Sequence, residues 1–119
     1  MLFTKKKEQP QEEFSRKTSE EMEQKQENTI VIEVLKNIKD PELNVDLWTL
    51  KLIYDIHIEG KKLDIFMTFT SPMCPYGPFL LQQVQEQLEK KGFQKVHVEL
   101  TFNPLWQPDE EIKEILGIA

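Results

Sequence analysis

The chain of 119 residues has little cysteine, little glycine and no long apolar run. Its single cysteine, Cys74, excludes a disulfide within the chain and a metal cluster held by four cysteines of one chain. A lone thiol also fits a reducing compartment, so we expect a cytoplasmic protein. No apolar run approaches the roughly 18 residues of a membrane-spanning helix. The basic start, Met1–Lys7, has no apolar stretch behind it, unlike a secretory signal.

The chain also lacks an excess of basic residues. It carries 15 Lys and Arg against 21 Asp and Glu, which gives a formal net charge of −6. Nucleic-acid binding needs a basic surface that neutralises phosphates, and anionic membranes attract basic segments. We therefore expect neither nucleic acid nor a membrane among its partners.

The first part of the chain is poor in apolar residues. Residues 1–28 contain only five of them, which are Met1, Leu2, Phe3, Phe14 and Met22. A segment this polar buries too little apolar surface to offset the entropy lost on ordering. We predict a disordered or loosely helical arm over residues 1–28 and one folded domain over residues 29–119.

Hydrophobic periodicity predicts six elements in the folded part. We expect helices from Thr29 to the Asp40–Pro41 turn, from Pro75 to Gly92 and from Pro108 to Gly117, and strands over residues 52–59, 63–70 and 95–102. Gly60 marks a hairpin turn between the first two strands, and the middle helix is a long crossover to the third. Each strand has one apolar face, so the helices should cover one side of the sheet. The fold class is a small two-layer α+β sandwich of order α-β-β-α-β-α, with a mainly antiparallel or mixed three-stranded sheet.

Cys74 is the most reactive side chain of the sequence. It stands just before the predicted helix that begins at Pro75, where unpaired N–H groups and the helix dipole favour a thiolate. A thiolate binds metal or attacks an electrophile. The alternative is an inert, buried cysteine that serves only packing.

Other polar and aromatic residues admit two interpretations. His57 and His97 fall on the predicted solvent face among acidic residues, where they are either solvated side chains or part of a metal-binding cluster. Asp40 either supports its own turn through backbone hydrogen bonds or belongs to a site. Trp48 and Tyr76 lie beside the special turns and would form an apolar rim around Cys74 if those turns converge.

Four segments in order resemble the SufT/PaaD-like iron–sulfur cluster assembly domain family. They are Asp40-Pro41-Glu42, Leu52-Ile53-Tyr54-Asp55, Met67-Thr68-Phe69-Thr70-Ser71-Pro72-Met73-Cys74-Pro75 and Val98-Glu99-Leu100-Thr101-Phe102-Asn103-Pro104-Leu105-Trp106. The string from Met67 to Pro75 is the most specific of the four. The resemblance covers about residues 29–117.

The resemblance implies a small α+β fold and a role in maturing iron–sulfur proteins, without enzymatic activity. It implies that Cys74 is the functional thiol, that Asp40 and Glu42 lie near it, and that Thr68 and Thr70 match the threonines of the motif. Cys74 would be a transient or shared cluster ligand, and no cofactor would be stably bound. The implied partners are client apoproteins and other iron–sulfur assembly proteins. Since one chain offers one thiol, a cluster also needs a homodimer, a partner or a small thiol.

Two functions of other classes stay open beside this one. They are an interaction subunit of a larger complex with a structural cysteine, and a thiol-dependent enzyme that uses Cys74 as a nucleophile. The chain also departs from the family pattern at two places. It has Leu50-Lys51 where the family usually has Leu-Gly, and Asn103-Pro104-Leu105-Trp106 where the family usually has Asp-Pro-Pro-Trp. Lysine adopts a positive φ at a cost that glycine does not have.

Overall fold

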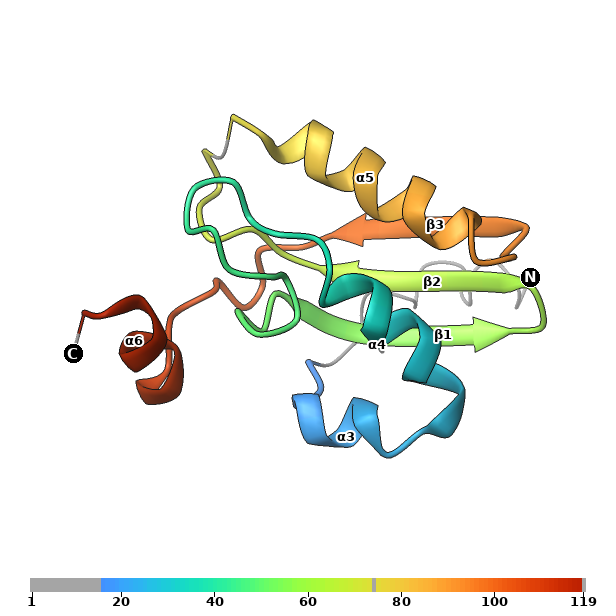
Figure 1. Ribbon diagram of the computed structural model, residues 1–119, viewed down its shortest axis with the longest axis horizontal. Coiled ribbons are helices and arrows are strands. Elements are labelled where there is room, and N and C mark those ends of the chain that lie inside the picture. Colours follow the sequence, from blue (N-terminus) through green and yellow to red (C-terminus); the bar gives the residue numbers. More distant parts are fainter. Residues whose placement is uncertain (1–15, 74, 119) are drawn as a thin grey trace, which may run out of the picture.

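A computed structural model describes residues 16–73 and 75–118. The elements along the chain are α3 (Ser19–Glu23), the 3-10 turn η1 (Gln26–Asn28), α4 (Thr29–Leu35), β1 (Ile53–Glu59), β2 (Lys62–Met67), α5 (Gly77–Glu89), β3 (Lys95–Leu100) and α6 (Glu110–Leu116). Helices α4 and α5 lie on one face of the sheet, and α6 stands beyond the ends of the strands (Figure 1). No described helix is long and apolar enough to cross a membrane.

The three strands form one mixed sheet in the order β1-β2-β3. β1 and β2 pair antiparallel through the hairpin at Gly60, which has a φ of +64°. β2 and β3 pair parallel, because α5 carries the chain back along the sheet before β3 begins. The predicted α+β sandwich with a mixed three-stranded sheet is confirmed.

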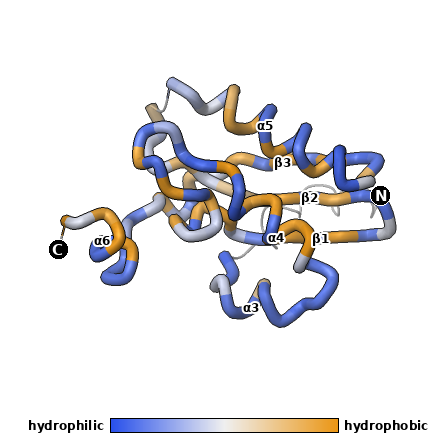
Figure 2. The backbone as a smooth tube through the Cα atoms, in the orientation of Figure 1, coloured by the Kyte–Doolittle hydropathy of each residue, from blue (hydrophilic) through white to orange (hydrophobic). Residues whose placement is uncertain are grey.

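The core lies between the sheet and the two helices. Figure 2 shows that hydrophobic residues are frequent along α4, β1 and β2. The fully buried side chains of the core include Val31, Leu35, Leu63, Ile65, Met67, Leu80, Val84 and Leu88. These residues recur at a spacing of four along the helices and of two along β2, which is the periodicity that the sequence displays.

The alternation predicted for the first strand fails at its start. A register shift between Ile53 and Asp55 leaves Tyr54 as an extra residue, and the first four residues of β1 are all buried. A bulge of this kind turns a strand locally and breaks the in-out pattern. Tyr54 and Asp55 are therefore buried by packing that the alternating pattern does not reveal.

The predicted arm is structured over its last residues. Helix α3 begins with a capping box in which Thr18 and Glu21 exchange hydrogen bonds, and Met22 is 2% exposed in the main core. The side chain of Asn28 donates to the carbonyl of Met22 over 2.9 Å. One buried apolar residue, one capping box and the hydrogen bond of Asn28 thus fasten this helical part of the polar segment to the core. Residues 1–15 of the predicted arm lie outside the described residues.

The first predicted helix is shorter than expected. α4 ends at Leu35, five residues before the predicted stop at Asp40. Lys39 forms an isolated antiparallel bridge with Asp46, which takes the chain out of the helical path. The residues after α4 therefore belong to a loop that folds back on itself.

Candidate functional site

Three loops meet at one end of the sheet, and they carry the motifs of the sequence (Figure 1). They span residues 36–52, 68–76 and 101–109. The first two are joined by a backbone hydrogen bond of 2.9 Å from the N–H of Thr68 to the carbonyl of Leu52. The first and third are joined by the indole N–H of Trp106, which donates to the carbonyl of Leu50 over 2.7 Å. Segments far apart in sequence thus form one loop cluster.

An aromatic contact holds the second and third loops together. The rings of Phe69 and Phe102 meet edge to face, with centroids 6.1 Å apart and an interplanar angle of 68°. Phe69 is 5% exposed and also packs against the start of α5 at Gly77. A Cβ atom at Gly77 would lie 2.4 Å from a ring carbon of Phe69. Glycine at this position therefore permits the close approach of helix and ring.

Asp40 supports its own turn, as one of the two interpretations expects. The residue is 1% exposed, and its Oδ1 accepts hydrogen bonds from the backbone N–H groups of Glu42 and Leu43 over 2.8 and 3.0 Å. Its backbone N–H donates to Val45, and its carbonyl accepts from Asn44. Asp40 thus shapes the first loop from inside, while Glu42 is exposed on its surface.

Thr68 and Tyr54 connect the site to the sheet. Thr68 is fully buried and bonds the side chain of Tyr54, whose hydroxyl donates to the carbonyl of Pro104 over 2.8 Å. The guanidinium of Arg16 lies 4.6 Å above the Tyr54 ring. Burial raises the pKa of Tyr54, partly offset by the nearby charge of Arg16 and by the bond to Thr68. The hydroxyl of Tyr54 therefore stays protonated and serves as a hydrogen-bond donor. Thr70 lies half-buried in the second loop, two residues after Thr68.

Cys74 itself lies outside the described residues, so its thiolate character and its approach to Asp40 or Glu42 stay predictions. The helix after it differs from the prediction. α5 begins at Gly77, and Pro78 rather than Pro75 stands in its first turn. Tyr76, in a non-helical conformation, occupies the cap position and makes no side-chain cap hydrogen bond.

The two residues predicted to rim Cys74 differ in exposure, and the rim itself stays a prediction because Cys74 lies outside the described residues. Tyr76 is 48% exposed at the end of the second loop. Trp48 is buried at 6% exposure, and its indole N–H donates to the carboxylate of Glu23 on α3 over 3.3 Å. Trp48 therefore packs beneath the N-terminal segment, which the sequence pattern did not predict as part of the fold.

The two histidines lie on the outer sheet face, as the alternation predicts. Nε2 of His57 lies 2.7 Å from the carboxylate of Asp55, which also binds Nζ of Lys17 over 2.9 Å. His97 pairs with Glu99 over 3.0 Å. Among the described residues, no three His, Cys, Asp or Glu side chains are grouped as a metal site. Asp55 is thus a buried anchor for Lys17 and His57.

Lys51 has a backbone conformation that favours glycine. Its φ is +60°, in the left-handed region, which lysine adopts at a higher cost than glycine. Its side chain reaches α6, where Nζ bonds the carboxylates of Asp109 and Glu111. The hydrogen bond that Nζ of Lys51 donates to the carboxylate of Asp109 raises the pKa of Lys51 and lowers the pKa of Asp109.

These shifts predict a pH window for the contact between Lys51 and α6. The lowered pKa of Asp109 stabilises the fold above about pH 4, and this is lost as the pH falls through the folded value. The raised pKa of Lys51 stabilises the fold below about pH 10, and this is lost as the pH rises through the folded value. Because solvent screens the pair, the contribution inside the window is about 0.2–1 kcal/mol. Urea unfolding of Lys51→Met should show a smaller deficit at pH 3 than at pH 7, and an equal deficit at both would contradict the assignment.

Three residues of the site carry weaker sequence signals than the thiol. Tyr54 stands inside the quoted Leu-Ile-Tyr-Asp segment, but only the bulge turns its hydroxyl to the third loop. Gly77 lies between Pro75 and Pro78 in the sequence. Its contact with the Phe69 ring depends on how the loop folds, which residue spacing in the sequence does not reveal. Lys51 was recognisable as a departure, whereas its partners on α6 were not.

The chain is similar to known proteins over most of its length. A family model described as "Iron-sulfur cluster assembly protein" matches residues 28–100, so the family resemblance is confirmed. The "Fe-S protein maturation auxiliary factor" of Porphyromonas gingivalis is 32% identical over 88 residues, which are 72% of this chain and 84% of that protein. The "Fe-S protein maturation auxiliary factor SufT" of Staphylococcus aureus is 35% identical over 72 residues, covering 59% and 82% of the two chains.

A solved structure supports the fold. A conserved hypothetical protein of Thermotoga maritima superposes with a TM-score of 0.64 at 40% identity, covering 73% of this chain and 90% of that one. The family match contains the first two loops and the cysteine. The third loop and α6 lie C-terminal to it.

Proposed function

Since the chain belongs to the iron–sulfur cluster assembly protein family, we propose that it is a non-enzymatic maturation factor that assists delivery of iron–sulfur clusters to client apoproteins. The observation that carries the proposal is the family match over residues 28–100, which contains Cys74 and two of the three converging loops. The relatives named maturation auxiliary factors support it. Other iron–sulfur assembly proteins are the proposed partners, in the cytoplasm.

The cluster is cargo in this proposal, and Cys74 is the thiol that contacts it. A thiolate is the form of cysteine that binds iron. The second loop carries Cys74 in the sequence, and buried contacts hold both of its ends. At its start the N–H of Thr68 donates to the carbonyl of Leu52, and after its end Gly77 packs against the ring of Phe69. Asp40 serves by holding the first loop in shape, and the exposed Glu42 offers a charge to a partner.

One cysteine cannot complete the ligand set of a cluster. Cysteine ligation of a [2Fe–2S] or [4Fe–4S] centre normally takes four thiolates, and the chain has one. The remaining ligands come from a second chain, a client or a small thiol. We therefore expect the purified monomer to carry no stoichiometric iron.

Anaerobic reconstitution with iron, sulfide and a small thiol tests the function. Wild-type protein should gain a labile chromophore and pass it to an apo-ferredoxin, whereas Cys74→Ala should retain neither iron nor transfer. His97→Ala is the matched control, because His97 bonds Glu99 on the outer sheet face and should leave loading unchanged. Loading that survives the loss of Cys74 would overturn the ligand assignment and favour an adaptor that holds no cluster.

The thiol-enzyme alternative needs a base near Cys74. Both imidazoles belong to the outer sheet face and hydrogen-bond carboxylates of their own strands. This arrangement engages both imidazoles with carboxylates, which disfavours either histidine as that base.

A further inference from the structure

A short segment in front of the matched family region packs along the first strand. Residues 16–27 precede the family match at residues 28–100 and contain α3 and the start of η1. Figure 1 shows α3 beyond β1, on the side of the sheet away from β3. We call residues 16–27 the strap.

One side chain anchors the strap. Met22 is 2% exposed, and it is the only buried residue of the strap. The carboxylate of Glu23 accepts from the Trp48 indole over 3.3 Å, and the Met22 carbonyl accepts from Asn28 over 2.9 Å. A helix of five residues is unstable in isolation, so α3 depends on this anchor. Truncation of Met22 should therefore release the strap while the sheet and α5 stay folded.

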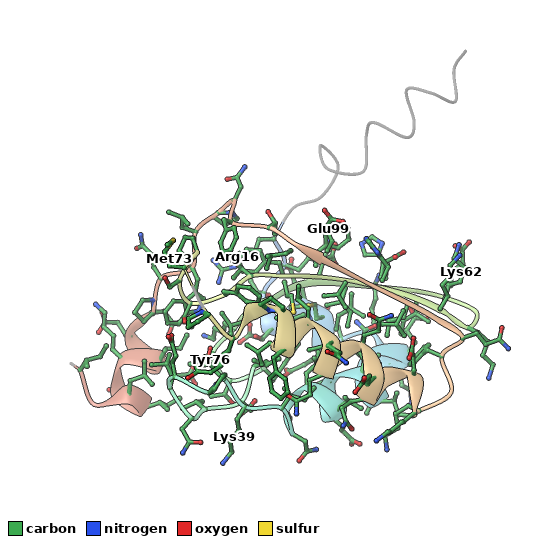
Figure 3. The ribbon with its side chains drawn as sticks, turned by 90° about the horizontal axis from the view of Figure 1, so that it is seen from above. Arg16, Lys39, Lys62, Met73, Tyr76 and Glu99 are labelled. Carbon is green, nitrogen blue, oxygen red and sulfur yellow. The ribbon has the colours of Figure 1, made fainter. Side chains whose placement is uncertain are left out.

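The beginning of the strap contacts Tyr54 and its neighbour Asp55. The backbone N–H of Lys17 donates to the Tyr54 carbonyl over 2.9 Å, and the Arg16 guanidinium lies 4.6 Å above the Tyr54 ring. Nζ of Lys17 bonds the buried carboxylate of Asp55 over 2.9 Å. Figure 3 labels Arg16 in the view from above. The strap thus holds both the backbone and the ring of Tyr54.

The hydroxyl end of Tyr54 belongs to the loop cluster. It donates to the carbonyl of Pro104 on the third loop over 2.8 Å, and Thr68 at the start of the second loop bonds the same side chain. One side chain therefore spans from the strap to two of the three loops.

A cavity separates the strap from the end of the third loop. It has a volume of about 290 Å³, and it is lined by residues 16–20 of the strap and by Lys51, Ile53 and Asp109. Coupling between segments is carried by groups in contact, which an open cavity does not supply. The contacts of Tyr54 are therefore the route by which the strap acts on the third loop.

We propose that Tyr54 is a positioning residue of the loop cluster and that the strap holds it in place. With the strap docked, the Tyr54 hydroxyl stays on Pro104 and the third loop keeps one arrangement. With the strap released, the contacts from Arg16 and Lys17 are lost, and the third loop becomes more mobile. The step from here to cluster transfer rests on the proposed function. Groups held in one geometry react faster than mobile ones, so release of the strap should slow transfer.

The two tryptophans of the chain report separately on the strap and on the loop cluster. The Trp48 indole N–H donates to Glu23 on the strap, and the Trp106 indole N–H donates to the carbonyl of Leu50. Hydrogen exchange of the two indole N–H groups, followed by ¹H–¹⁵N NMR of the full chain without iron, measures both. We expect Met22→Ala to accelerate each exchange at least about tenfold.

Tyr54→Phe interrupts the route and leaves the strap docked, because it removes the hydroxyl and keeps the ring under Arg16. Trp106 should then exchange faster, and Trp48 should exchange as in wild type. Since both changes act through one contact, adding Met22→Ala to Tyr54→Phe should accelerate Trp106 by less than about twofold more. An additive effect would overturn the assignment to Tyr54.

Leu88→Ala is the matched control, because it truncates a fully buried side chain of the same core on α5, outside the strap. Both indoles should exchange in it at nearly the wild-type rates. Arg16→Ala combined with Lys17→Met repeats the test should Met22→Ala fail to fold, since neither side chain is buried. A Trp106 indole that ignores these strap variants would overturn the proposal.

Cluster transfer forms a separate arm of the test, in which Tyr54→Phe should transfer more slowly than Leu88→Ala. The exchange measurements contain no iron, so they hold whether or not the protein carries a cluster. Wild-type protein that fails to load a cluster would refute the proposed function alone. Wild-type protein that transfers a cluster no faster than Tyr54→Phe would refute the positioning role in transfer.

Discussion

Replacing Gly77 by alanine should lower the free energy of unfolding by about 1–3 kcal/mol, although the substitution improves helix propensity. Alanine in a helix is favoured over glycine by about 0.8–1.0 kcal/mol, so propensity alone predicts stabilisation. The new Cβ would lie 2.4 Å from Cε2 of Phe69, and the ring is 5% exposed with little room to move. The sign of the change, measured by urea unfolding, therefore decides between propensity and packing.

Removal of the ring supplies the control for Gly77. In a Phe69→Leu background the added methyl group has space, so Gly77→Ala should cost less than half as much as in wild type. Equal costs in the two backgrounds would show that Phe69 does not limit the site. The variant also bears on function, because Phe69 joins the second loop to Phe102 on the third. A displaced ring should reduce cluster transfer even where the protein remains folded.

The fold followed from the sequence wherever local period and burial agree. Leu63, Ile65 and Met67 alternate along β2, and Leu80, Val84 and Leu88 follow α5 at helical spacing. The length of the crossover at α5 then leaves β3 free to pair parallel with β2. Where the burial of a residue depends on a partner far away in the sequence, the hydrophobic periodicity does not predict it. Met22 stands alone among polar residues, and only its place in the core reveals that α3 belongs to the fold.

The site was predictable as a set of motifs and not as a set of contacts. The segments around Asp40, Thr68 and Asn103 all follow or precede predicted elements, and the sequence left open whether these segments converge. The bonds that join them involve a backbone carbonyl at Leu50 and a strand bulge at Tyr54, and neither leaves a trace in residue type. Lys51 shows this limit, since its left-handed backbone and its hydrogen bond to Asp109, 58 residues away, are not visible in the sequence.

Asp40 offers the second large effect, because its two candidate roles predict different variants to fail. Asp40→Ala removes an acceptor that two backbone N–H groups share in a buried turn, so we expect a loss of about 2–3 kcal/mol in the free energy of unfolding. Asp40→Asn keeps a carbonyl oxygen in the same place and removes only the charge. It should retain most of the stability, since an Asn side chain forms the same turn.

Cluster transfer by Asp40→Asn then separates turn formation from a chemical role at the site. Oδ1 of Asp40 already accepts from Glu42 and Leu43 within its own loop. If that is the whole contribution, Asp40→Asn should transfer a reconstituted cluster at nearly the wild-type rate while Asp40→Ala transfers poorly because its loop is misshapen. Glu42→Gln gives the matched comparison at the exposed acid of the same turn. A stable Asp40→Asn protein without transfer would instead assign the carboxylate charge to the site, as the family resemblance implied.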